Sequence, residues 1–295
     1  MHRTPLLSLW RWLISLLLLS LQPSLQANDA DVLRYPVWAD GDAQRSRYVL
    51  EQLQLALDKA GSTLRLQPSS YGMEQGRALA DLERGRNLDV VWSMTSRERE
   101  ARLLPVRIPL DKGLLGWRIA LLPGNRATLL KDVRSLDDLR QFTAGQGHDW
   151  PDQLILSSNG LPVKASSSYP GLFQMLKAQR FDYLPRSVME IWDELDHPRS
   201  EQLVADEHLL LRYPTALYFF FSPQRPELAQ TVREGMEAAL ADGSFDQLFH
   251  QHFGASLQRA RLAQRHVIHL HNPLLPEATP LYRPELWFNA QEQAP

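Results

Sequence analysis

Three side chains between residues 95 and 99 have the types and spacing that suit an anion. Thr95 and Ser96 stand just before Arg99. An arginine guanidinium offers a planar fork of donors that matches the two oxygens of a carboxylate, and donors at a helix start lie where anions are favoured. Thr95 and Glu98 also fit a capping box, and Arg99 can pair with Glu98 or Glu100 on the surface. The segment suits either anion binding or local capping.

A second polar group, His148-Asp149-Trp150, stands between a predicted strand and a predicted helix. Asp149 has the type of an N-cap residue, which is as good an explanation as ligand contact. Trp150 can stack on a ligand or brace the helix. Trp38, just past the first predicted strand, can pack in the core or at its rim.

Motifs of common enzymes are absent from the sequence, which has no Gly-x-Ser-x-Gly elbow, no phosphate loop and no His-Glu-x-x-His. His266, His269 and His271 cluster near the C-terminus. On an extended strand His269 and His271 share a face and can ligate a metal with a third group, but an ordinary polar strand is the simpler interpretation. We therefore expect no catalytic residue, no metal, no cofactor and no enzyme activity.

The charge balance argues against nucleic-acid binding. The 295 residues include 32 basic and 34 acidic side chains, and two of the basic ones lie in residues 1–27. The absence of cysteine excludes disulfides, thiol chemistry and lipoprotein anchoring through a cysteine.

Residues 1–27 have the pattern of a secretory signal. Arg3 and Arg11 give a positive start, Leu13–Leu21 forms a short apolar core, and Ala27 ends a plausible cleavage site. The alternative is a membrane anchor, but the apolar run is shorter than the ~20 residues that span a bilayer. The sequence therefore predicts export to the periplasm with cleavage near Ala27.

Short apolar strands alternate with amphipathic helices along most of the remaining chain, which predicts an α/β fold with mainly parallel sheets. Strands are predicted at 33–37, 64–67, 88–92, 118–122, 142–145, 181–184 and 216–221. Helices are predicted at 48–60, 78–84, 135–140, 149–158, 169–179, 226–241 and 245–253. Residues 255–295 contain several prolines and little periodicity, but their apolar side chains suggest an extension docked on the body.

Four stretches together resemble the family 3 solute-binding proteins, the periplasmic receptors for polar amino acids. They are 82–99, 135–147, 176–182 and 225–254, in the family's order. The resemblance implies a two-lobed periplasmic-binding-protein type II fold, with two mostly parallel sheets flanked by helices and joined by two hinge strands. Such lobes shut over a ligand by hinge motion. Lobe 1 would comprise residues 28–117 and 217–254, and lobe 2 residues 118–216.

The resemblance also implies a binding site. The family holds the ligand carboxylate with the arginine that is Arg99 here, although the spacing from threonine to Glu-Arg is one residue shorter than usual. Relatives place backbone donors near residues 147–150 and an aromatic side chain at the position of Trp38. The implied ligand-binding residues are Ser93, Thr95, Ser96, Arg99, Trp38, His148, Asp149, Trp150, Arg186 and Ser187.

The clearest departure from the family lies at Ser187, where relatives have an aspartate that binds the ligand's amino group. Here a hydroxyl stands beside the cation of Arg186. An ammonium would lose its partner at this point. We therefore expect a ligand other than a standard α-amino acid, with the possibility of two acidic groups. Glu190, one helical turn beyond Arg186, can instead supply the missing carboxylate.

The expected function is that of a monomeric periplasmic solute-binding protein that closes over a small, carboxylate-bearing ligand for ABC-type transport through an inner-membrane permease. Two alternatives remain open. One is a ligand-sensing module for a signalling partner. The other is a cyclic-acid dehydratase on the same fold, for which His148, Asp149 or Glu190 can serve as acid or base.

Overall fold

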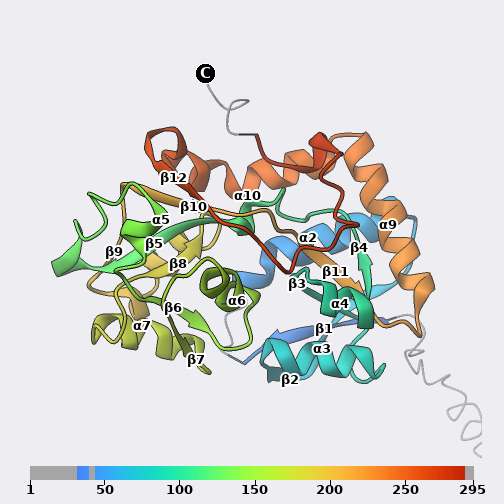
Figure 1. The fold of residues 1–295 in the computed structure, drawn as a ribbon. Coiled ribbons are helices and arrows are strands. Elements are labelled where there is room, and N and C mark those ends of the chain that lie inside the picture. Colours follow the sequence, from blue (N-terminus) through green and yellow to red (C-terminus); the bar gives the residue numbers. More distant parts are fainter. Residues whose placement is uncertain (1–31, 40–43, 290–295) are drawn as a thin grey trace, which may run out of the picture. The chain divides into compact units, whose positions relative to one another are not determined.

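The computed structural model describes residues 32–39 and 44–289, and its elements are drawn in Figure 1. The predicted signal segment, residues 1–27, lies outside the described residues. Within the described ranges no helix has the length and apolar character needed to cross a membrane. By their mutual contacts the described residues from Leu33 onward form one unit. The lobe boundaries expected from the sequence stay predictions.

The first sheet combines strands that are far apart in the sequence. β3 (Val90–Met94) and β4 (Leu104–Val106) both pair antiparallel with β11 (Leu217–Phe221), which lies between them. The continuous apolar run of β11 is almost wholly buried, as expected of a strand that is covered on both faces. A smaller sheet pairs β1 (Val32–Trp38) with β2 (Arg65–Met73).

The second sheet has the order β12-β10-β5-β8, and β9 also pairs with β5. Its parallel pair is β10 with β12, whereas β5 is antiparallel to each of its neighbours. A separate parallel pair joins β6 and β7. The bounds are β5 (Trp117–Pro123), β6 (Ala144–Gly147), β7 (Val163–Ser166), β8 (Leu184–Ser187), β9 (Leu203–Ala205), β10 (Leu209–Arg212) and β12 (His266–His269).

The α/β class is confirmed, but the sheets are mixed, so the prediction of mostly parallel sheets was wrong. β11, which comes much later in the sequence, lies between β3 and β4. A simple alternation of strands and helices would instead place β3 and β4 side by side. The predicted strand at 181–184 begins three residues too early, because β8 starts at Leu184. This shift places Arg186 and Ser187 inside a buried strand.

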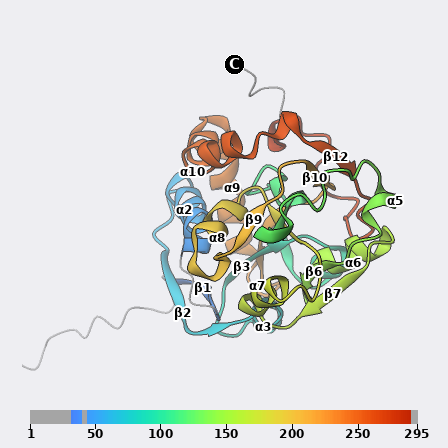
Figure 2. The ribbon, with the colours of Figure 1, turned by 90° about the vertical axis from the view of Figure 1, so that its left-hand side faces the viewer.

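Helices pack around these sheets (Figures 1 and 2). α2 and α9 cross closely at Gly235, where a Cβ atom would lie 1.7 Å from the carbonyl oxygen of Ala56. The helices are α2 (Gln44–Lys59), α3 (Gln75–Glu83), α4 (Arg97–Arg102), α5 (Leu136–Leu139), α6 (Pro151–Ser158), α7 (Tyr169–Lys177), α8 (Ile191–Asp196), α9 (Pro226–Ala241) and α10 (Ser244–Ala260). Short 3-10 turns are η2 (Leu114–Gly116), η3 (Gly124–Arg126), η4 (Pro198–Ser200), η5 (Leu262–Gln264) and η6 (Pro284–Leu286).

Two crossover segments, residues 107–116 and 213–216, connect the first sheet with the second. The buried carboxylate of Asp111 fixes the first of them to the start of β11, because it accepts hydrogen bonds from the backbone N–H groups of Leu115 at 2.6 Å, Gly113 at 3.2 Å and Leu217 at 3.3 Å. Burial raises the pKa of Asp111 to about 6, although these backbone donors oppose the shift.

The raised pKa predicts a pH dependence of stability. Between the ordinary value of 3.8 and about 6 the folded protein keeps a proton on Asp111 that the unfolded chain releases. The contribution of this group is therefore most favourable below the lower value, and it falls by about 3 kcal/mol as the pH rises through the folded-state value. Urea unfolding should show wild type losing about that much stability relative to Asp111→Asn between pH 3 and pH 7. A difference that stays constant with pH would contradict this account.

Candidate functional site

A cavity of about 600 Å³ lies among residues of both larger sheets and the helices around them. Its walls carry the aromatic rings of Trp38, Trp92, Trp150 and Tyr169 together with many charged side chains. Trp38 meets Trp92 edge to face, with ring centroids 5.4 Å apart. Of the residues predicted to bind a ligand, Trp38, Asp149, Trp150 and Arg186 line this cavity.

Arg99 lies beside the cavity and points at residues of its wall. Its Nη1 donates to Ser93 Oγ at 2.6 Å and to the carbonyl oxygen of Met94 at 2.7 Å. Its Nη2 donates to Gln75 Oε1 at 3.0 Å and to the carbonyl oxygen of Asp149 at 3.4 Å. All four acceptors are neutral oxygens, and burial lowers the pKa of Arg99 to about 10. The predicted surface pairing with Glu98 or Glu100 is not the arrangement found.

The hydroxyl groups of Thr95 and Ser96 form hydrogen bonds with residues of α4. Ser96 is the N-cap of α4, and its Oγ accepts from the Arg99 backbone N–H at 3.2 Å. Thr95 is buried, and its hydroxyl donates to Glu100 Oε1 at 2.6 Å. The capping box that the sequence allows between Thr95 and Glu98 is therefore replaced by these two contacts.

Asp149 connects two sides of the cavity. Its carboxylate accepts from the backbone N–H of Gly76 in the first turn of α3 at 3.2 Å, and its carbonyl accepts from Arg99. The N-cap of α6 is Trp150 and not Asp149, because the helix begins at Pro151. His148 is exposed and does not line the cavity, and its Nδ1 lies 3.8 Å from Asp149 Oδ1.

The most prominent feature of the cavity wall is a ladder of charges, most of them buried, that the sequence did not reveal as a unit. Arg118 pairs with Asp152 at 2.6 Å and with Glu190 at 3.4 Å. Arg186 pairs with the same Glu190 at 3.0 Å and with Glu194 at 2.6 Å. We call these five residues the charge ladder. Two arginines and three carboxylates leave it with one formal negative charge.

Neighbouring hydroxyls and rings complete the charge ladder. Arg118 Nε donates to Tyr213 Oη at 2.9 Å, and Tyr169 Oη donates to Glu194 at 2.6 Å. The Arg186 guanidinium stacks on Trp150, with 4.9 Å between Cζ and the ring centroid. Burial opposes the charge of Arg186, but Glu190 and Glu194 outweigh it and raise the pKa of the guanidinium well above its ordinary value.

The placement of Arg186 and Ser187 changes the expected ligand. Arg186 is buried and matched by two carboxylates, so it does not offer the uncompensated cation that the sequence suggested. Ser187 is fully buried, donates to the Leu114 carbonyl at 3.0 Å and is absent from the cavity wall. The wall carries four arginines and seven carboxylates. This excess of negative charge disfavours a ligand with two acidic groups.

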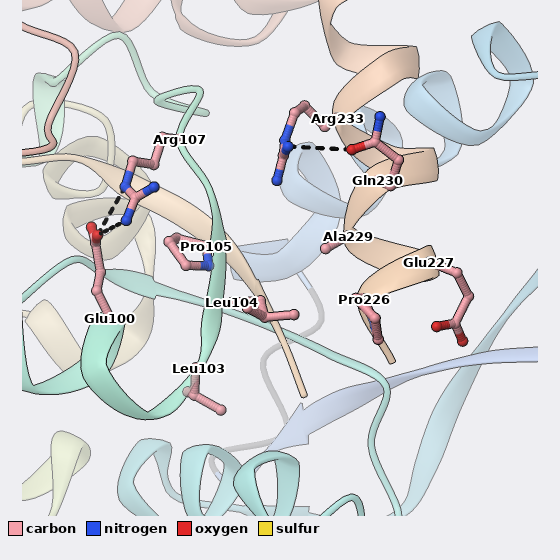
Figure 3. Close-up of a pocket in the computed structure, with 10 residues that line it drawn as sticks. All are labelled: Glu100, Leu103, Leu104, Pro105, Arg107, Pro226, Glu227, Ala229, Gln230 and Arg233. Carbon is pink, nitrogen blue, oxygen red and sulfur yellow. Dashed lines mark hydrogen bonds and ion pairs between the residues drawn. The ribbon is translucent and has the colours of Figure 1, made fainter. Parts of the chain in front are cut away.

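A second hollow, of about 560 Å³, lies between β4 and α9 and contains none of the predicted site residues (Figure 3). Its polar side chains bond to one another, as Arg107 does with Glu100 at 2.7 Å and Arg233 with Gln230 at 3.2 Å. Across residues 32–39 and 44–289 no group of three or more His, Asp or Glu side chains is arranged to hold a metal. His266 instead contacts the carbonyl oxygen of Arg134 at 2.6 Å.

Removing one charge from the ladder should destabilise the fold strongly. Glu194→Gln leaves part of the buried Arg186 charge uncompensated, which costs about 3 kcal/mol or more. The matched control is Glu227→Gln, since Glu227 is 60 % exposed and pairs with the exposed Arg225. That pair should be worth about 0–1 kcal/mol. Urea unfolding measures both changes, and equal losses would show that the ladder is not a buried unit.

No protein-family model matches this sequence, and no curated protein matches it. Solved structures do resemble it. An arginine-specific periplasmic binding protein of Salmonella typhimurium is 15 % identical, with 76 % of this chain and 100 % of that chain covered and a TM-score of 0.56. A histidine kinase sensor domain similar to periplasmic binding proteins is 14 % identical, covers 76 % of this chain and 96 % of its own, and has a TM-score of 0.57.

A third similar structure is an ancestral amino-acid-binding protein, a precursor of cyclohexadienyl dehydratase. It is 14 % identical, covers 76 % of this chain and 96 % of its own, and has a TM-score of 0.56. At such identities the likeness is one of fold. The chain therefore has the α/β fold of the periplasmic amino-acid-binding proteins of ABC transporters.

Proposed function

We propose that this chain is a periplasmic solute-binding protein whose cavity takes a small, amino-acid-like molecule with a carboxylate and a cationic group. The supporting observation is the combination of Arg99, whose four side-chain hydrogen bonds go to neutral oxygens, with a wall that has an excess of carboxylates. A zwitterionic or cationic amino acid complements both features, whereas a doubly acidic molecule complements only the first.

Arg99 is the group that we assign to the ligand carboxylate. The two acceptors of its Nη2, Gln75 and Asp149, belong to residues that line the cavity. A ligand carboxylate in their place would form a charge-assisted and bidentate pair, which is about twice as strong as bonds between neutral groups. Desolvation lowers the pKa of Arg99 to about 10, so the cation persists at neutral pH and gains from an anionic partner.

Glu190 is the group that we assign to the cationic part of the ligand. Its side chain is 31 % exposed, while its ladder partners Arg118 and Arg186 are almost fully buried. Its Oε2 accepts from the backbone N–H of Ser187 at 3.3 Å. A carboxylate three residues beyond Ser187 thus supplies the charge that the sequence lacks at position 187 itself. An ammonium or guanidinium near Glu190 would offset the excess negative charge of the ladder.

The size and lining of the cavity are consistent with such a ligand. Small-molecule sites typically have volumes of about 300–1,000 Å³, with aromatic walls and a few placed polar groups. The cavity has about 600 Å³ and is lined by six Trp, Tyr and Phe residues, which leaves room for a sizeable side chain. Rings of this kind attract both apolar groups and cations.

Delivery of the ligand to an inner-membrane permease is the role that we propose for a monomer exported by residues 1–27. Sensing is the alternative, and one structural neighbour is a sensor domain. A dehydratase is less well supported, because Asp152, Glu190 and Glu194 are each paired with an arginine, which suits charge recognition more than proton transfer.

Calorimetry with arginine, lysine, glutamine and succinate tests the proposed ligand class. The account expects the nitrogen-bearing carboxylates to bind, and succinate not to. Arg99→Ala should weaken binding at least tenfold, because a hydrogen bond to a charged group contributes about 1.5–3 kcal/mol. Glu190→Gln should weaken the cationic ligands similarly.

The control is Arg102→Ala on the same helix, since Arg102 is 50 % exposed and pairs with Glu83 and Glu98 away from the cavity wall. It should leave affinity unchanged. Tight binding of succinate, or unchanged affinity in Arg99→Ala, would refute the assignment.

A further inference from the structure

The segment after α10 runs back across the body of the protein. We call residues 262–288 the strap. It begins with η5, forms β12 and continues without regular structure to η6, and its red trace passes from β12 towards α9 in Figure 1. Nothing in the proposed binding function uses this segment, yet many of its side chains are fixed to other elements.

The first anchor of the strap is the second sheet. β12 pairs with β10 in parallel from Leu209–His266 to Arg212–His269. Ile268 and Leu270 are buried in the cluster that contains Leu209 and Leu211 of β10. Asn159 also holds this end of the strap, because its side chain donates to the His271 carbonyl at 2.8 Å and accepts from the His271 N–H at 3.0 Å.

The middle of the strap holds the helix that carries Arg99. The backbone N–H of Arg97, the first residue of α4, donates to the Leu274 carbonyl at 3.1 Å, and its guanidinium bonds to the carbonyl of Pro273. Asn272 donates to the carbonyl of Pro214 in the second crossover segment at 2.9 Å. The strap therefore connects β12, the second crossover and the start of α4.

The last anchor lies on the first crossover segment. The N–H of Phe288 donates to the Lys112 carbonyl at 2.8 Å, and its ring meets Trp117 edge to face at 5.4 Å. The Trp287 ring covers Gly113, where a Cβ atom would lie 2.5 Å from it.

An ion pair also connects this end of the strap to α9. Arg283 Nη1 and Nη2 contact the two carboxylate oxygens of Glu237 at 2.7 and 2.9 Å. The strap therefore ends on α9 and on the segment that leads into the second sheet.

We propose that the strap is a conformational restraint that limits how far the two sheets separate when the cavity opens. It is fixed to the second sheet at one end, to α9 and the first crossover at the other, and to the Arg99 helix between them. Opening therefore requires release of the weaker end. That end is the last anchor, because it depends on one partly exposed ion pair, two rings and the hydrogen bonds of Lys112. The first anchor is an edge strand that pairs with β10 along four residues and is also held by the two hydrogen bonds of Asn159. The restraint rests on the cavity opening by hinge motion, as the proposed function requires.

The absence of cysteine allows a direct test with two engineered labels. Asp132→Cys and Glu227→Cys are suitable positions, because these side chains are 86 % and 60 % exposed. Pulsed EPR then measures the distance between spin labels in the ligand-free protein. We expect Arg283→Ala combined with Trp287→Ala to lengthen and broaden the distance distribution. The matched control is Tyr282→Ala, since this strap residue is 82 % exposed and should have no effect.

Amide hydrogen exchange separates release of the anchor from general unfolding. The double variant should exchange about tenfold faster in residues 107–117, with unchanged protection in β3 and β11. The single variant Arg283→Ala, which removes only a partly exposed ion pair, should shift both readouts in the same direction to a smaller extent. Unchanged distances and exchange rates in both variants would overturn the restraint. No ligand is present in either measurement, so these results stand even if the proposed ligand class is wrong.

Discussion

The structure around the cavity depends on the pairing of two buried arginines with three carboxylates. Arg118 and Arg186 stand on adjacent antiparallel strands, and Asp152, Glu190 and Glu194 reach them from α6 and from α8 with its preceding residue. Buried charges are tolerated only when they are matched and hydrogen-bonded. The ladder therefore forms as a unit, and its one surplus negative charge is part of the excess of carboxylates on the cavity wall.

Arg99 differs from the two ladder arginines, because all four acceptors of its side-chain hydrogen bonds are neutral oxygens. Arg99 lies beside the same cavity, because it bonds to Gln75 and Asp149 of the cavity wall. The proposed recognition of a molecule with both charges rests on this arrangement. Asp111 and the strap act on the same arrangement from outside the cavity, because both hold the segments by which the chain passes between its two main sheets.

Part of this arrangement was predictable from the sequence. Long periodic helices, the buried strand at 217–221 and the place of Arg99 near the start of a short helix follow from local patterns. The ladder does not, because Arg118 and Asp152 are 34 positions apart and become neighbours only when β5 and α6 pack. Strands of three or four residues, such as β9 and β12, carry too little periodicity to detect. The sequence pointed to Glu190 as a carboxylate near Ser187, but it did not show that Glu190 and Glu194 both pair with Arg186.

Native mass spectrometry of the gently purified protein tests the central claim most directly, because it identifies the small molecule that the cavity retains without presupposing its identity. The account predicts a bound compound with one carboxylate and at least one amino or guanidino group, lost when Arg99 is replaced by alanine. Retention of a nitrogen-free dicarboxylate, or of the same compound after that replacement, would contradict it.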